Sequence, residues 1–132
     1  MRRSGYTESC EGWELIRWRG AVASAIRGKR GQAFLREMLA AMDGLPQKRL
    51  IVGNLEEGAE VCALGSVGRI RGMDMSAINY EDAHDVAQAF GIPRALAAEI
   101  EFINDDDFCW QNITPEQRFE SVRKWIISKL AE

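Results

Sequence analysis

A cysteine stands at the start of a glycine-rich segment in the middle of the chain. Cys62 is followed by Gly65 and Gly68, and this run of small residues ends at Arg69 and Arg71. At the start of a helix, backbone N–H groups lower the pKa of a thiol, which makes Cys62 a candidate nucleophile. The same residue can instead be a small apolar group packed where two elements approach closely, and we favour this interpretation.

Thiol catalysis would also require a base. His84 is the one histidine of the chain, and Asp85 or Asn104 offers a third member, so that Cys62, His84 and Asn104 follow the order of papain-like enzymes. His84 lies beside acidic residues in a predicted surface helix, where a solvated histidine is the usual finding. A thiol hydrolase using Cys62 and His84 is therefore the third of our functional hypotheses, and we expect no cofactor.

Positive charge gathers around two glycines near residue 30. Glycines beside cations can present N–H groups and side-chain charge to a phosphate. No Walker pattern is present, because the upstream glycine and the Ser/Thr after the lysine are absent. A helix–turn–helix reader of DNA fits the length of the segment, although the acidic total weakens it. The alternative function is thus a phosphate- or nucleotide-sequestering protein or a nucleic-acid-binding module, with the candidate residues Arg27, Lys29, Arg30, Arg69 and Arg71.

Three consecutive aspartates form the most acidic segment of the chain. Asp105, Asp106 and Asp107 follow Asn104, and Trp110 comes shortly after them. Oxygen donors of this kind can ligate Mg²⁺ or Ca²⁺, but the glycine and glutamate of a calcium-binding loop are missing, so we predict a solvated turn and no metal site. These aspartates could imitate a phosphate backbone for a basic partner surface, with Trp110 as its anchor.

Composition indicates one globular domain over residues 1–132. The chain is 46% hydrophobic and 28% charged, which is enough apolar material for a continuous core. The N-terminal residues lack the apolar run of a signal peptide, and no segment has the length of a membrane span. Cys10, Cys62 and Cys109 are widely separated and form no Cys-x-x-Cys pair, as expected for reduced thiols. We therefore expect an intracellular, cytoplasmic protein with no membrane contact.

The two halves of the chain have opposite charge. Residues 1–72 hold 12 Lys/Arg and 8 Asp/Glu, whereas residues 73–132 hold 5 and 12. The asymmetry fits a basic face for a polyanion, an acidic face for a basic protein, or two halves that attract each other. That attraction can act within one chain or across a homodimer, and the sequence leaves these readings open.

The periodicity of apolar residues predicts mostly helices. Segments 13–26 and 34–42 carry apolar stripes at three- and four-residue spacing, and we expect them to form a helical hairpin around a turn at 28–31. Residues 49–61 predict a small β-hairpin. From Cys62 the spacing favours a helix whose glycines imply close packing against another backbone.

Further helices are expected over 81–90 and 93–103, and the last helix has the clearest start signal. Thr114 is a capping threonine, Pro115 suits the first helical position, and Gln117 completes a capping box. The predicted fold class is therefore α+β, mainly α, with five to six helices and a small β-hairpin in a single domain.

Several stretches together resemble a family of small proteins encoded by bacteriophages and prophages. They are residues 17–20, 28–37, 61–65, 91–92, 104–105 and 114–118, and the resemblance runs over nearly the whole chain. The Cys-Ala-Leu-Gly and Asn-Asp segments are also similar to a broader bacterial domain of unknown function. Neither group brings an established activity, so the resemblance identifies no catalytic residue.

The resemblance implies a mode of action that is common among phage proteins. Small acidic phage proteins outside the virion often bind and block a host protein, including the nucleic-acid-guided machinery that degrades phage DNA. The leading hypothesis is therefore stoichiometric binding, as an inhibitor or adaptor of a host protein with a basic surface, in an anti-defence or anti-CRISPR role. On this hypothesis the protein is not an enzyme.

Overall fold

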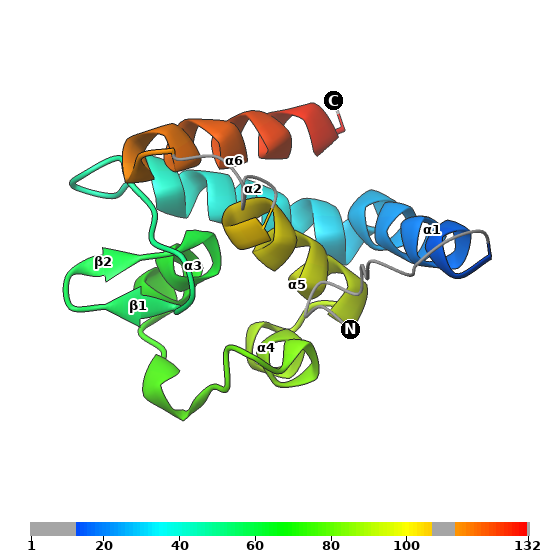
Figure 1. Cartoon of the computed structure of the whole chain (residues 1–132), viewed down its shortest axis with the longest axis horizontal. Coiled ribbons are helices and arrows are strands. Elements are labelled where there is room, and N and C mark those ends of the chain that lie inside the picture. The colour runs from blue at the N-terminus through cyan, green and yellow to red at the C-terminus, as the bar shows by residue number, and fades with distance from the viewer. Residues whose placement is uncertain (1–12, 107–112, 132) are drawn as a thin grey trace.

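The computed structural model describes residues 13–106 and 113–131, and within them it confirms a mainly helical fold with one small hairpin (Figure 1). The α-helices are α1 (Trp13–Arg27), α2 (Lys29–Asp43), α3 (Ala63–Arg71), α4 (Ala83–Phe90), α5 (Arg94–Glu101) and α6 (Pro115–Lys129). The strands are β1 (Glu56–Glu57) and β2 (Glu60–Val61), and two short turns of other helix types are η1 (Met75–Ala77) and η2 (Phe102–Asp106). None of the described helices is long and apolar enough to cross a bilayer.

The first two helices form a bent rod, and the predicted helical hairpin is wrong. Gly28 is the one residue between α1 and α2, and its N–H still donates to Ser24 O at 3.1 Å. Figure 1 shows α2 continuing away from α1 instead of folding back. A Cβ on Gly31 would collide with the carbonyl oxygen of Ala25. Glycine is thus needed here for close approach at a bend, whereas the sequence pattern suggested a reversing turn.

The β-hairpin packs against the start of α3, as the glycines of that helix predicted. Strands β1 and β2 pair antiparallel, with Glu57 opposite Glu60. A Cβ on Gly65 would collide with the carbonyl oxygen of Leu55, so the helix and the segment before β1 lie backbone to backbone. A Cβ on Gly68 would instead meet the flexible side chain of Met75, which would have to shift to admit it.

Helix α5 continues beyond its predicted end, through the π turn η2. Asn104 in this turn is 2% exposed, and Asp105 is half-buried. The prediction of a solvated turn starting at Asn104 is therefore wrong for these two residues. Their side chains face the interior because the helix carries on for one more turn after Glu101.

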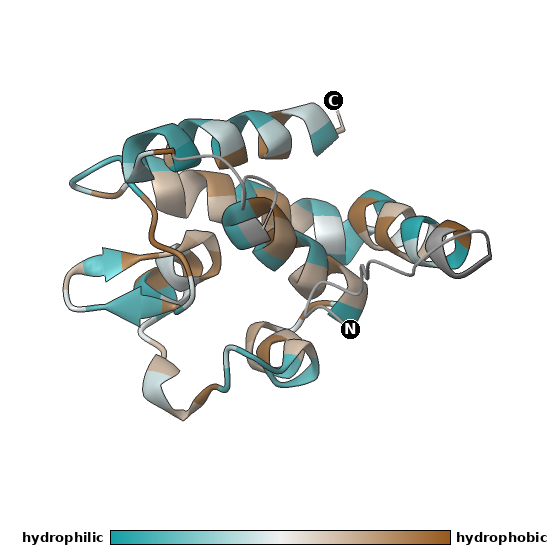
Figure 2. Cartoon of the chain, in the orientation of Figure 1, coloured by the Kyte–Doolittle hydropathy of each residue, from teal (hydrophilic) through white to brown (hydrophobic). Residues whose placement is uncertain are grey.

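Helix α6 begins as predicted. The Thr114 side chain accepts a hydrogen bond from Gln117 N at 3.0 Å, and the Gln117 side chain accepts one from Thr114 N at 2.8 Å. Figure 2 shows hydrophilic residues on the outer side of α6 and hydrophobic residues on the side facing α2. The core includes Leu35, Met38 and Met42 from α2, Leu64 and Val67 from α3, Phe90 from α4, Leu96 and Ile100 from α5, and Phe119, Val122 and Ile126 from α6.

Candidate functional site

The thiol of Cys62 serves as the cap of α3. Its Sγ accepts a hydrogen bond from Gly65 N at 3.3 Å, and the side chain is 1% exposed. Burial raises the pKa of Cys62 to about 12, and the hydrogen bond from Gly65, which lowers it, does not offset this effect. At neutral pH the group is a buried neutral thiol, which is the state of a packed residue and not of a nucleophile.

The fold does not bring the predicted thiol triad together. His84 is exposed on α4 and makes no hydrogen bond to Cys62 in the described part of the chain, and Asp85 accepts from Asn79 N at 2.7 Å. Asn104 does come close to the cysteine, because its Oδ1 accepts from Ala63 N at 3.1 Å. That contact fixes the start of α3, and it does not bring the imidazole of His84 to the thiol of Cys62.

Asn104 and Asp105 instead join three distant segments. The Asn104 amide donates to Ile51 O at 2.8 Å, and Asp105 accepts from the hydroxyl of Tyr80 at 2.7 Å and from Gly53 N at 3.2 Å. Arg118 of α6 donates to Asn104 O at 3.0 Å. These bonds hold the segment before the hairpin against η2 and α6.

A buried acid, Glu101, accompanies this network. Glu101 is 1% exposed, and its carboxyl acts electrostatically on both Cys62 and Tyr80. Burial, together with Cys62, Asp105 and Glu101, raises the pKa of the Tyr80 hydroxyl. Sequence reasoning missed Tyr80, Glu101 and Arg118. The i, i+3, i+4 spacing of Glu101, Asn104 and Asp105 was the available signal, because it places them on one face once the helix is continued.

Of the predicted partner-binding residues, Asp105 is the one whose side chain the structure describes. Both of its carboxylate oxygens accept hydrogen bonds within the chain, Oδ1 from Asn104 at 2.5 Å and Oδ2 from Tyr80 and Gly53. The side chain of Asp106, and Asp107 and Trp110 as whole residues, lie outside the described part.

Two of the predicted phosphate-binding arginines have partners within the chain. Arg69 donates to Glu56 at 2.8 Å and to the carbonyl oxygen of Ala59 at 2.7 Å, which ties α3 to the hairpin. Arg71 makes a two-pronged ion pair with Glu37 at 2.7 and 2.8 Å, and its guanidinium lies 5.6 Å from the centre of the Phe34 ring. This pairing lowers the pKa of Glu37.

The remaining three candidate cations, Arg27, Lys29 and Arg30, are exposed around the bend between α1 and α2. Within the described residues, no acidic side chain forms an ion pair with any of them. The structure thus separates the five predicted cations into a paired group on α3 and an unpaired group at the bend.

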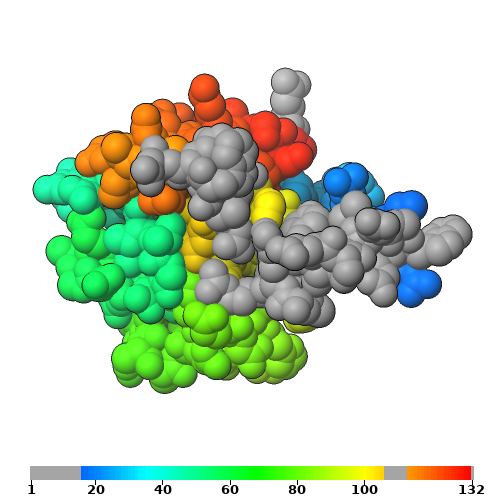
Figure 3. All heavy atoms as spheres, in the orientation of Figure 1, coloured from blue at the N-terminus to red at the C-terminus, as the bar shows by residue number. Residues whose placement is uncertain are grey.

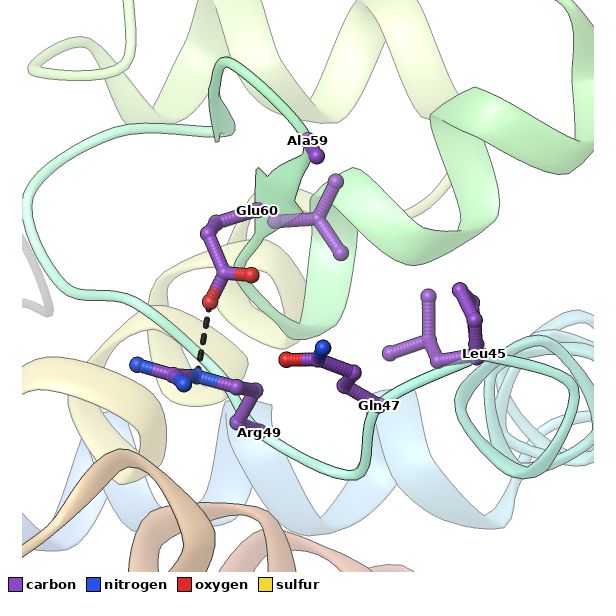
Figure 4. Close-up of a pocket in the computed structure, with 7 residues that line it drawn as sticks. Leu45, Gln47, Arg49, Ala59 and Glu60 are labelled. Carbon is purple, nitrogen blue, oxygen red and sulfur yellow. Dashed lines mark ion pairs between the residues drawn. The ribbon is translucent and has the colours of Figure 1, made fainter.

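A hollow of about 150 Å³ lies between the segment after α2 and strand β2 (Figure 4). Its lining consists of Leu45, Pro46, Gln47, Arg49, Ala59, Glu60 and Val61. Arg49 Nε lies 2.8 Å from Glu60 Oε1, and a second acid, Glu116, lies 3.7 Å from the same guanidinium. The hollow therefore combines apolar walls with an ion pair that is about one-third exposed on both sides.

A second hollow, of about 300 Å³, lies between β1 and η1. It is lined by Asn54, Leu55, Glu56, Met75, Ser76, Ile78 and Tyr80, none of which is a cation. Its lining therefore offers no positive charge that could bind a phosphate. Among the described residues no group of three or more His, Cys, Asp or Glu side chains is placed to hold a metal ion.

No family model, curated protein or solved structure matches the chain.

Proposed function

We infer that this protein acts by stoichiometric binding to a protein partner, and that the hollow between Leu45 and Val61 receives one apolar side chain of that partner. The size of the hollow carries the proposal. A volume of about 150 Å³ accommodates a group as large as benzene, whereas small-molecule sites are typically about 300–1,000 Å³. One side chain of a protein fits this space, and a nucleotide does not.

The surroundings of the hollow favour a partner with basic groups. Glu57 lies directly across the hairpin from Glu60, and like charges in this position are destabilising. Arg49 neutralises Glu60, while Glu57 has no ion-pair partner among the described residues. A lysine or arginine of the partner could pair with Glu57, which agrees with a host protein that has a basic surface.

The buried state of Cys62 supports binding over catalysis, since a neutral, enclosed thiol offers no nucleophile. The resemblance to phage proteins supports a bacterial host protein as the partner, with the chain as its inhibitor or adaptor in an anti-defence or anti-CRISPR role. It also supports a cytoplasmic location in that host.

The test uses a variant that fills the hollow. Ala59 is exposed at its rim, so Ala59→Gln should place a longer side chain there without entering the core. We expect a partner captured from host lysate by the wild-type chain to bind this variant at least about tenfold more weakly, because an anchoring side chain is a typical binding hot spot.

The matched control is Ala21→Gln, an exposed alanine on α1, which should bind the same partner as tightly as the wild type does. Isothermal titration calorimetry with the identified partner gives the affinities and the stoichiometry. Equal affinity for Ala59→Gln and the wild type would show that the partner does not use the hollow.

A further inference from the structure

A stretch of the chain that carries no acidic residue supplies a second, separate surface. Between Glu14 and Glu37 the sequence holds six Lys/Arg and no Asp or Glu. Five of these cations are exposed on α1 and at the start of α2, and we call them the basic helix surface: Arg17, Arg19, Arg27, Lys29 and Arg30. Their density of charge contrasts with the net charge of −3 of the whole chain.

These cations differ from most of the other described arginines in having no acidic partner. Arg49, Arg69, Arg71 and Arg123 each form an ion pair, with Glu60, Glu56, Glu37 and Asp43 respectively. In the described part of the chain, no ion pair involves any member of the basic helix surface. Their charge therefore remains available to an outside group.

The three arginines of α1 are exposed, and they are spread around the helix from the edge of its buried side outward. Val22 and Ile26 are buried and mark the inner side of the helix. At about 100° per residue, Arg19, Arg27 and Arg17 span an arc of about 160°, which begins at Arg19 beside the buried Ile26 and ends at Arg17 on the opposite side of the helix. Arg19 and Arg17 stand at the two edges of this arc, and between them lie the small residues Gly20, Ala23 and Ser24 and the exposed Ile16.

The shape of α1 fits a groove better than a pocket. Figure 1 shows the helix extending from one end of the molecule, beyond the helices that form the core. From Arg17 to Arg27 it is about 15 Å long, and Lys29 and Arg30 continue the charge around the bend. Such a surface is convex, so arginines on its two edges diverge and do not converge on a single carboxylate.

We propose that the basic helix surface binds the phosphate backbone of double-stranded nucleic acid, with α1 lying along a groove. A helix is about 10–12 Å across and the major groove of DNA is about 12 Å wide, so the edges of α1 face the two strands. Arginines diverging to both edges then reach phosphates on both sides. The contacts involve backbone phosphates, so binding is independent of sequence.

This surface is distinct from the hollow and does not depend on the partner proposed above. In the space-filling view, α1 (blue) lies at one end of the molecule and the hairpin region (green) at the other (Figure 3). A protein bound at the hairpin therefore leaves α1 accessible, and the chain can hold a protein and a nucleic acid together.

The test measures binding of a fluorescently labelled DNA duplex of about 20 base pairs as a function of salt, using fluorescence anisotropy. The slope of log K against log salt is about −0.9 for each phosphate neutralised, so five contacts give a slope near −4.5. We expect Arg19→Ala and Arg27→Ala each to make the slope shallower by about 1 and to weaken binding to unrelated duplexes equally.

Lys124→Ala is the matched control, because Lys124 is an exposed cation on α6, outside the basic helix surface. It should leave the slope unchanged, and circular dichroism should show that all three variants keep the helical content of the wild type. Ala59→Gln should bind DNA as the wild type does, which separates this proposal from the previous one.

Two results would overturn the proposal. One is the absence of duplex binding at low salt, or a slope that Arg19→Ala and Arg27→Ala do not change. The other is tighter binding of polyglutamate than of the duplex at equal salt, because the surface would then be one for acidic proteins.

Discussion

At the scale of single residues, Cys62 shows how strongly its surroundings determine whether a thiol is reactive. Its position before α3 offered two readings, a thiolate activated by a helix start or a packed small residue. The hydrogen bond from Gly65 is the one expected at a helix start, but burial has the larger effect and keeps the thiol neutral. The local motif was visible in the sequence, whereas the burial of the thiol and the nearby acids Asp105 and Glu101, which also raise its pKa, follow from the fold.

The raised pKa of Cys62 predicts a loss of stability in alkaline solution. A cysteine in the unfolded chain ionises near pH 8.5, while the folded chain holds its proton up to a pKa of about 12. Between these values the unfolded state binds fewer protons, so the free energy of unfolding falls as pH rises. Tyr80, whose pKa is also raised, adds an effect of the same sign.

Urea unfolding at pH values from 7 to 11 measures this dependence. The control is Cys62→Ala. Its free energy of unfolding should decline less above pH 8.5, because Tyr80 is then the only one of these two groups that still ionises. Parallel curves for the variant and the wild type would mean that the thiol is not enclosed in solution.

At the scale of elements, glycines determine how closely helices approach their neighbours. Gly65 is pressed against the carbonyl oxygen of Leu55, whereas a Cβ on Gly20 of α1 would meet no atom within 4 Å. Both glycines lie within helices, Gly20 in α1 and Gly65 in α3, so their positions in the secondary structure do not distinguish them. Their opposite surroundings give a matched pair of alanine substitutions.

Gly65→Ala should lower the free energy of unfolding by about 2 kcal/mol or more, because overpacking against a backbone atom forces α3 away from the hairpin. Gly20→Ala should raise it by about 0.5–1 kcal/mol, since alanine is the better helix former and nothing obstructs its Cβ. Chemical denaturation of the two variants beside the wild type checks both signs. A stabilising Gly65→Ala would refute the close contact with Leu55.

The elements also show what could be predicted from the sequence. Thr114, Pro115 and Gln117 are neighbours in the chain, so the start of α6 was correctly predicted from local rules. The hairpin and the helix after Cys62 were predicted for similar reasons. The inward turn of Asn104 was missed because it depends on contacts with residues far away, such as Ile51, 53 positions before it. The bend at Gly28 was missed because a glycine needed for close approach looks the same in the sequence as a glycine of a reversing turn. The hollow likewise joins two segments that no local pattern connects.

At the scale of the whole molecule, one buried glutamine links the first and last helices. Gln32 donates to Ile26 O at 2.8 Å and to Lys129 O at 3.0 Å, and it accepts from Ala131 N at 2.8 Å. The side chain therefore joins the end of α1, the start of α2 and the end of α6. Arg123 and Asp43 hold the middle of α6 to the end of α2 through a two-pronged ion pair.

Gln32→Ala should lower the free energy of unfolding by about 1–3 kcal/mol, because it leaves buried backbone groups without partners. It should also speed hydrogen exchange at Ala131 N–H. Gln88→Ala, at an exposed position on α4, is the control and should change stability by less than about 0.5 kcal/mol. Unchanged exchange at Ala131 would contradict the link between the helices.

The protruding helix α1 has a consequence for how the chain can diversify. Of its side chains that the structure describes, Val22 and Ile26 are the fully buried ones, so most of its outer positions are not needed to fold the body. Mutations can accumulate on that outer side without a penalty to the core, which α2 and α6 hold together. Natural variants of this protein should therefore differ in the exposed residues of α1, and hence in what α1 binds, while their core residues stay the same.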